Sequence, residues 1–256
     1  MPYIEAITKA GETIEIERYF SSRYKKQGIK RSDKVKPTKA EQKKVNTRIA
    51  EKKLRRLINA NYGYGDWHIN MGYIRKTGIT PRSKEEMQRD IEVLLRGLRS
   101  EYKKAGLILK YIHVMEIGEK GARHHHLIIN RGIDCKKIQE CWNKAYTEKS
   151  TIHFTPLDNS GNYAKLANYL IKYTDKTVGT ENALQGKRWN CSKNLVRPEP
   201  QIKIISNREW YRAEPKELKG YYVDKDSVVS GVHSPEYYGY GFFRYTLVKH
   251  GKTKGG

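Results

Sequence analysis

The feature that most constrains the fold is the segment Tyr111–Asn130, which reads YIHVMEIGEKGARHHHLIIN. Both of its halves are rich in Ile, Val, Leu and Tyr, and Gly118 and Gly121 punctuate the polar stretch between them. This pattern predicts two strands joined by a tight hairpin. The Leu-Ile-Ile run that ends the second half indicates a buried strand, so the rest of the chain is organised around it.

Side chains alternate between the two faces of a strand, so His124 and His126 share one face and His125 takes the other. The two imidazoles lie about 7 Å apart along the strand and can share a divalent metal ion. Glu116 lies next to the turn and can fold back beside them as a third ligand, whereas His113 sits an odd number of residues from it and faces the other way. The alternative is a surface strand that carries three solvated histidines.

The succession of a glutamate, a glycine-bearing turn, a His-x-His pair and an apolar run resembles the histidine–hydrophobic–histidine (HUH) motif of enzymes that nick single-stranded DNA. The middle residue of that motif is usually apolar or aromatic, and here it is His125. The resemblance implies a metal site made by Glu116, His124 and His126.

A nucleophilic tyrosine on a later helix is expected from that resemblance, and residues 161–176, GNYAKLANYLIKYTDK, predict such a helix. Helical periodicity gives it an apolar stripe of Tyr163, Ala167, Leu170 and Ile171 and a basic stripe of Lys165, Lys172 and Lys176. Tyr169 and Tyr173 lie at the border, about 40° apart around the helix and about 6 Å apart along it. Both hydroxyls can therefore reach one site, although two tyrosines at this spacing can equally be packing residues.

The doubled Y-x-x-K, which is Tyr169 with Lys172 followed by Tyr173 with Lys176, resembles the two-tyrosine motif of rolling-circle replication initiators from microviruses and related bacterial elements. The resemblance implies that Tyr169 and Tyr173 are the nucleophiles. It also implies that the two lysines stabilise the charge that develops during attack.

From residue 66 onward the pattern predicts strand, helix, strand, strand, helix, strand, which is the split βαβ order, followed by the tyrosine helix. The fold class is therefore α+β. The order also agrees with the palm-like antiparallel sheet of the HUH endonuclease fold, which the resemblance implies. An RNA-recognition domain has the same order, but its first aromatic pattern is absent from the His124 strand. His68 on the first strand can approach the site, and we assign it a structural role.

The sequence predicts three consecutive parts of the chain. These are a hairpin with a basic arm and helix in residues 1–60, the nicking domain in residues 61–178, and a β-rich extension packed on the core in residues 179–256. The segment 21–36 predicts a mobile basic arm. A capping box at 37–41 then predicts a basic helix that clamps phosphates, with a solvated face as the alternative. Aromatic residues in 237–245 can stack bases or pack an ordinary β extension, and packing is favoured.

The formal net charge of +23 indicates a polyanionic partner, and nucleic acid is the leading one. No apolar run reaches membrane-spanning length, and the amino-terminal residues lack a signal-peptide pattern, so a cytoplasmic location in a bacterial host cell is expected. The three cysteines form no Cys-x-x-Cys pair and are expected to be free thiols. The final GKT lacks the glycine that a phosphate loop requires, so no nucleotide cofactor is expected.

The resemblance implies a site-specific single-strand endonuclease and strand transferase that starts rolling-circle replication at an origin hairpin. Its cofactor would be Mn²⁺ or Mg²⁺, its intermediate a 5′-phosphotyrosine, and its partners a host helicase and polymerase. A relaxase or transposase with the same chemistry is one alternative. A basic nucleic-acid-binding protein without catalytic activity is the other.

Overall fold

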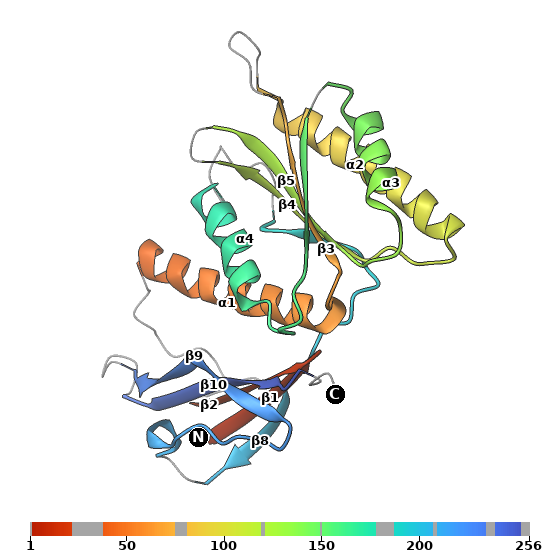
Figure 1. Ribbon diagram of the computed structural model, residues 1–256. Helices are drawn as coiled ribbons and strands as arrows, with labels where there is room; N and C mark the ends of the chain where they lie inside the picture. Colours follow the sequence, from red (N-terminus) through yellow and green to blue (C-terminus); the bar gives the residue numbers. More distant parts are fainter. Residues whose placement is uncertain are drawn as a thin grey trace. The chain divides into compact units, whose positions relative to one another are not determined.

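The fold is known from a computed structural model, and it is α+β with two antiparallel five-stranded sheets (Figure 1). The chain divides into two compact units, one of residues 1–46, 160–162 and 197–256 and one of residues 47–159 and 163–196. The structure describes residues 2–21, 38–74, 81–118, 121–148, 150–177, 187–206, 209–233 and 239–251, without the side chains at 173 and 175–177.

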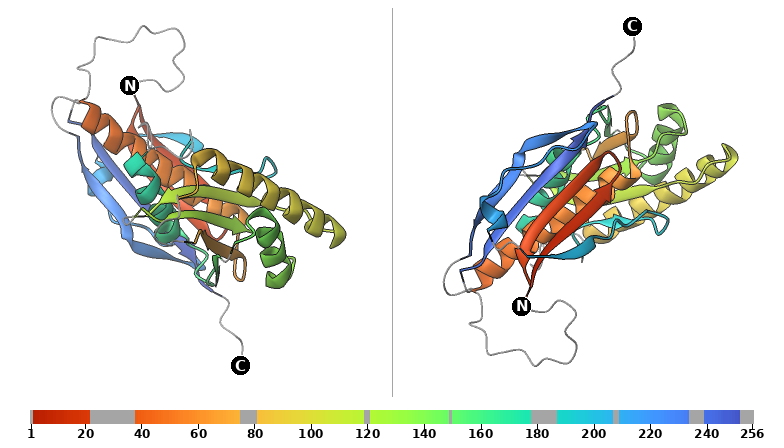
Figure 2. Two further views of the ribbon diagram at one scale, coloured as in Figure 1. Left: turned by 90° about the horizontal axis from the view of Figure 1, so that it is seen from above. Right: turned by 90° about the horizontal axis from the view of Figure 1, so that it is seen from below.

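The first unit is built from both ends of the chain. Its strands are β1 (Tyr3–Ala10), β2 (Thr13–Phe20), β8 (Gln201–Ile205), β9 (Tyr221–Val232) and β10 (Gly241–Lys249), with a short 3₁₀ helix, η1 (Trp210–Arg212). The sheet order is β8-β1-β2-β10-β9, and Figure 2 shows the red amino-terminal strands beside the blue carboxy-terminal ones. The amino-terminal hairpin and the carboxy-terminal strands therefore form one sheet, although the sequence pattern places residues 1–60 and 179–256 in two separate parts of the chain.

One face of this sheet carries its own apolar core. Ile14 and Ile16 of β2 lie opposite Leu247 and Tyr245 of β10, and all four side chains are buried together with Phe243. The aromatic residues of β10 thus pack the sheet. Tyr237 and Tyr238 and the basic segment 22–37 lie outside the described residues.

The second unit contains the predicted succession of strands and helices. Its strands are β3 (Trp67–Gly72), β4 (Tyr111–Ile117), β5 (Arg123–Ile129), β6 (Thr151–Pro156) and β7 (Asn190–Cys191), in the order β6-β3-β5-β4-β7. The strand that carries the histidines, β5, lies in the middle of the sheet between β3 and β4. Its backbone is therefore held on both sides.

Four helices are described: α1 (Lys39–Asn61), α2 (Lys84–Lys104), α3 (Cys135–Ala145) and α4 (Ala164–Thr177). The predicted capping box is present at the start of α1, where Thr38 exchanges hydrogen bonds with Glu41. Ser83 and Glu86 form a second capping box at the start of α2. The α2 helix ends just before Gly106, whose φ of 69° favours glycine. No described helix combines the length and the apolar composition needed to cross a membrane.

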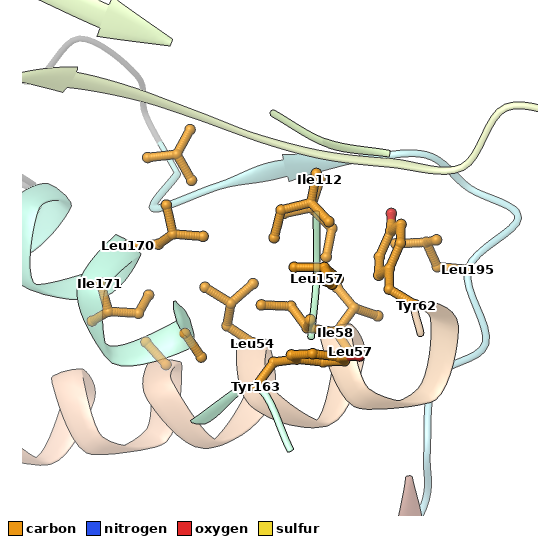
Figure 3. Packing of buried hydrophobic residues seen from close by; sticks show 14 residues of the cluster. Leu54, Leu57, Ile58, Tyr62, Ile112, Leu157, Tyr163, Leu170, Ile171 and Leu195 are labelled. Atoms are coloured by element: carbon orange, nitrogen blue, oxygen red, sulfur yellow. The ribbon is translucent and has the colours of Figure 1, made fainter. Parts of the chain in front are cut away.

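The sheet of the second unit lies between two helical layers. On one face, Ile112, Val114 and Ile128 pack against α1 and α4 (Figure 3). On the other face, Ile69, Met71, Leu127 and Ile129 pack against α2 and α3. The predicted apolar stripe of α4 is buried throughout, so this helix is fixed against the first face of the sheet.

Candidate functional site

The histidine strand and its partner place three polar side chains on the face covered by α1 and α4. Glu116 of β4 lies directly opposite His124 of β5, and His126 lies two residues farther along the same face. The Nε2 atom of His126 is 2.6 Å from Oε2 of Glu116, and both side chains are buried. The structure thus brings Glu116 and His126 into direct contact, with His124 as their neighbour.

The ring of His124 occupies space beside two glycines. A Cβ atom added at Gly72 would lie 3.3 Å from Cδ2 of His124 and 2.7 Å from Oγ1 of Thr151, and one added at Gly118 would lie 3.5 Å from Cε1 of His124. Gly72 pairs directly with His124 across β3 and β5. The absence of a side chain at position 72 therefore makes room for the imidazole.

Two imidazoles and one carboxylate are metal ligands that suit Mn²⁺. They also suit Mg²⁺ if oxygen atoms of a substrate complete its coordination shell. The Glu116 and His126 donor atoms lie at hydrogen-bond distance, whereas two ligands of one Mg²⁺ bonded at right angles would be about 3 Å apart. In the described part of the chain, no group of three or more His, Cys, Asp or Glu side chains is arranged to hold a metal ion. The donor chemistry fits such an ion, and binding it would require the side chains to separate by a few tenths of an ångström.

His68 of β3 belongs to the same cluster, although the sequence suggests only a structural role. Its Nε2 atom is 3.2 Å from Nδ1 of His126, and the two rings are stacked with their centroids 5.4 Å apart. Burial, and secondarily the charge of His126, lower the pKa of His68 to about 4. His68 is therefore a neutral imidazole at pH 7.

Tyr169 of α4 lies against this pair of histidines. Its ring centroid is 5.5 Å from that of His126 and 6.4 Å from that of His68, in both cases with the rings close to perpendicular. The side chain is 39% exposed, so it combines contact with the cluster and access to solvent. Lys172 on the same helix is exposed, and the side chains of Tyr173 and Lys176 lie outside the described residues.

The opposite face of the sheet carries a buried chain of polar side chains. Nε2 of His113 is 2.9 Å from Nδ1 of His125, Nε2 of His125 is 2.6 Å from the Tyr73 hydroxyl, and that hydroxyl donates to Asp90 at 3.0 Å. Arg82 closes the chain with hydrogen bonds of 3.0 and 3.2 Å to the two oxygens of Asp90. His113 and His125 therefore face away from Glu116.

This polar chain has one consistent direction of donation. A carboxylate only accepts, so the proton of Tyr73 points to Asp90 and the tyrosine oxygen accepts from Nε2–H of His125. Nδ1 of His125 is then left to accept from His113. Burial raises the pKa of Tyr73, lowers that of His125 well below its usual range and lowers that of His113 to about 3, so all three groups are neutral at pH 7.

Two further polar residues share the face of the cluster and were not singled out from the sequence. Asn70 of β3 lies opposite His126, and His153 of the edge strand β6 lies opposite Asn70. Alternation along WHINMGY places Asn70 on the same face as His68, which is the signal that could have identified Asn70, whereas this segment says nothing of His153. Their alignment with His126 depends on the strand order and could not be read from the segment itself.

Comparison with known proteins gives one family. Residues 74–178 match the family model described as Replication-associated protein ORF2/G2P, which is less than half of the chain. This match supports a replication-related role and includes Glu116, the His124–His126 strand and α4, while β3 with His68 precedes it. No match was found among curated proteins or among solved structures.

Proposed function

We propose that this protein is a rolling-circle replication initiator that nicks and rejoins single-stranded origin DNA through a covalent tyrosine intermediate. The observation that carries the proposal is the contact between Tyr169 and His126. It joins the tyrosine helix to a buried histidine–glutamate pair, and all of these residues lie in the segment that matches the replication-associated family. The proposed palm is the sheet β6-β3-β5-β4, with the histidines on an inner strand.

Glu116, His124 and His126 are the residues that would hold a divalent ion, either Mn²⁺ or Mg²⁺. When bound, such an ion would supply Lewis-acid polarisation of the scissile phosphate. The protein's own contribution is orientation. The ring of His126 is held by its contacts with Glu116 and His68, and Gly72 leaves space for the ring of His124.

Tyr169 or Tyr173 would attack the phosphorus atom in line. The tyrosine hydroxyl gives up its proton to solvent as its oxygen forms a bond to phosphorus, the bond from phosphorus to the 3′ oxygen breaks, and that oxygen takes up a proton from solvent and leaves as a free 3′-hydroxyl. A tyrosine hydroxyl with a reference pKa near 10 is mostly protonated at neutral pH, so the positive charge of Lys172 and Lys176 would help to stabilise the developing anion. Reversal of the same step rejoins the strand without ATP, because the phosphotyrosine keeps the energy of the phosphodiester.

The polyanionic partner would be single-stranded DNA, including a hairpin at the origin. Exposed basic residues of α1, among them Lys53 and Arg48, and the net charge of +23 support binding to phosphates. A host polymerase would extend the free 3′-hydroxyl, and a host helicase would unwind the duplex. Two tyrosines would allow one to hold the parental 5′ end while the other cuts the regenerated origin.

The test is an adduct assay with a pool of labelled single-stranded DNA and Mn²⁺, resolved on denaturing gels. The wild type is compared with Tyr169→Phe, Tyr173→Phe and the double variant, and Tyr64→Phe serves as the matched control because Tyr64 is 78% exposed in a loop of the same unit. We expect an adduct that survives denaturation, is lost with chelator and is absent from the double variant.

The single variants identify the dominant tyrosine, and the Tyr64→Phe variant should behave as the wild type. DNA binding without an adduct for any sequence in the pool would refute the proposed chemistry. The protein would then be a nucleic-acid-binding protein without nicking activity.

A further inference from the structure

His68 contacts both halves of the proposed site. Its Nε2 atom lies 3.2 Å from Nδ1 of His126, and its ring faces that of Tyr169 with a centroid distance of 6.4 Å and an interplanar angle of 73°. It comes from β3, an inner strand paired with β5 on one side and β6 on the other. The backbone that carries His68 is therefore fixed by two sets of hydrogen bonds.

The contact with His68 completes the bonding of His126. Nε2 of His126 is engaged by Glu116 at 2.6 Å and Nδ1 by His68, so both ring nitrogens have a partner and the side chain is 2% exposed. Rotation of this ring about its Cβ–Cγ bond would break both contacts in a site where little water is available to replace them. Removing the partner on Nδ1 would therefore free the orientation of the ring and leave a buried nitrogen unpaired.

We propose that His68 is a positioning residue that fixes the ring orientation of His126 through Nδ1, so that Nε2 is directed toward Glu116 and the ring toward Tyr169. The effect of this positioning on metal binding and nicking rests on the proposed function, because Nε2 is the atom that would bind the metal ion. Substitution of a residue that holds the second nitrogen of a metal-binding histidine commonly lowers metal affinity or activity by about tenfold to a hundredfold. His68 acts through His126 and need not touch the DNA.

Two substitutions separate the hydrogen bond from simple packing. His68→Phe keeps a ring of similar size beside Tyr169 and His126 but has no polar atom. His68→Gln places an amide group near the position of Nε2 and can restore the hydrogen bond to Nδ1 of His126. If His68 only fills space, the Phe variant is the better replacement, whereas a positioning role makes the Gln variant the better one.

The first measurement uses the metal-free protein and requires neither DNA nor activity. Nitrogen-15 spectra of the histidine rings report whether Nδ1 of His126 takes part in a hydrogen bond. We expect the signal of a hydrogen-bonded Nδ1 in the wild type and in His68→Gln, and the signal of an unbonded Nδ1 in His68→Phe. His233→Phe, at an exposed histidine of the other unit, is the control and should leave the signals of His126 unchanged.

The second measurement titrates each protein with Mn²⁺ and detects the free ion by electron paramagnetic resonance. We expect half-saturation of His68→Phe to need about tenfold more Mn²⁺ than the wild type, with His68→Gln closer to the wild type. The rate of adduct formation at fixed Mn²⁺ should fall in parallel, while the Kd for single-stranded DNA stays within about twofold. Thermal unfolding confirms that each variant is folded.

An unchanged Nδ1 signal of His126 together with wild-type Mn²⁺ binding in His68→Phe would overturn the inference and leave His68 as a packing residue. Equal losses in the Phe and Gln variants with unaltered His126 spectra would overturn it as well. A wild-type protein that forms no adduct refutes the proposed function alone, since the ring spectra and the Mn²⁺ titration still decide the role of His68.

Discussion

Replacing Tyr73 by phenylalanine removes a single oxygen from the polar chain behind the histidine strand and keeps the ring. That oxygen donates to Asp90 at 3.0 Å and accepts from His125 at 2.6 Å. The ring itself packs edge-on against Trp142 and Tyr146, so the change opens little space among the apolar neighbours. The effect should therefore come from hydrogen bonding.

The magnitude follows from what each partner loses. His125 is fully buried, and its Nε2–H would be left without an acceptor, at a cost of about 1–3 kcal/mol. Asp90 loses one donor but keeps Arg82 on both of its oxygens, which adds about 1 kcal/mol. We therefore expect Tyr73→Phe to lower the free energy of unfolding by about 2–4 kcal/mol.

Urea denaturation at pH 7 measures this change, with Tyr64→Phe as the matched control. Tyr64 is exposed, so its variant should remain within about 0.5 kcal/mol of the wild type. A second variant, His125→Leu, removes the donor, and its combination with Tyr73→Phe should cost less than the sum of the two single changes. If Tyr73→Phe is as stable as its control, or if the two changes are additive, the buried chain does not stabilise the fold in the way described.

Three further predictions concern other parts of the second unit. The pKa of His113 falls to about 3 in the folded state, first because of burial and then because of the charge of His126. Unfolding therefore binds a proton, and stability should decline as the pH drops below about 6.5, with a share of about 2 kcal/mol from His113 at pH 5 in addition to the shares of His68 and His125, whose pKa values are also lowered. Urea denaturation at pH 7 and pH 5 checks this, and His113→Gln should flatten the decline; an equally steep decline in that variant would contradict it. Gly72→Ala should destabilise the protein by about 1–3 kcal/mol and weaken Mn²⁺ binding, since the added Cβ would crowd Thr151 and His124. Gly118→Ala is the control, because its Cβ would meet only ordinary contacts and should change neither quantity. Thermal unfolding and Mn²⁺ titration compare the two variants, and equal effects would contradict the explanation by crowding. Leu54→Ala, at a fully buried position in α1, should cost about 2–5 kcal/mol in denaturant titrations, and a cost below about 1 kcal/mol would show that this core is loosely packed.

The parts of the fold that could be predicted from the sequence depend on short-range rules. Strand alternation placed His124 and His126 on one face, helical periodicity identified the buried stripe of α4, and the capping box at 37–41 marked the start of α1. Each of these features is set by residues within about one or two turns, or a few strand positions, of one another. The grouping of the elements into an α+β fold followed from their order.

The parts that could not be predicted depend on strand order and on contacts distant in sequence. His68 reaches His126 only because β3 lies beside β5, and the polar link from His125 to Asp90 requires α2 to cover the opposite face of the sheet. A histidine in the middle of the motif therefore looked like a departure from an apolar pattern, although the structure provides it with partners. Local periodicity indicates which face a side chain takes but not which neighbour it meets there.

The sheet built from both ends of the chain has a consequence for biosynthesis. During translation the hairpin β1–β2 leaves the ribosome more than 200 residues before β10, which pairs with β2 from Thr13 to Arg18. Until then β2 has an open edge of unpaired backbone groups, of the kind that recruits other chains or proteases. Shortened chains keep this open edge, so a nonsense mutation upstream of β10 yields material that aggregates or is degraded.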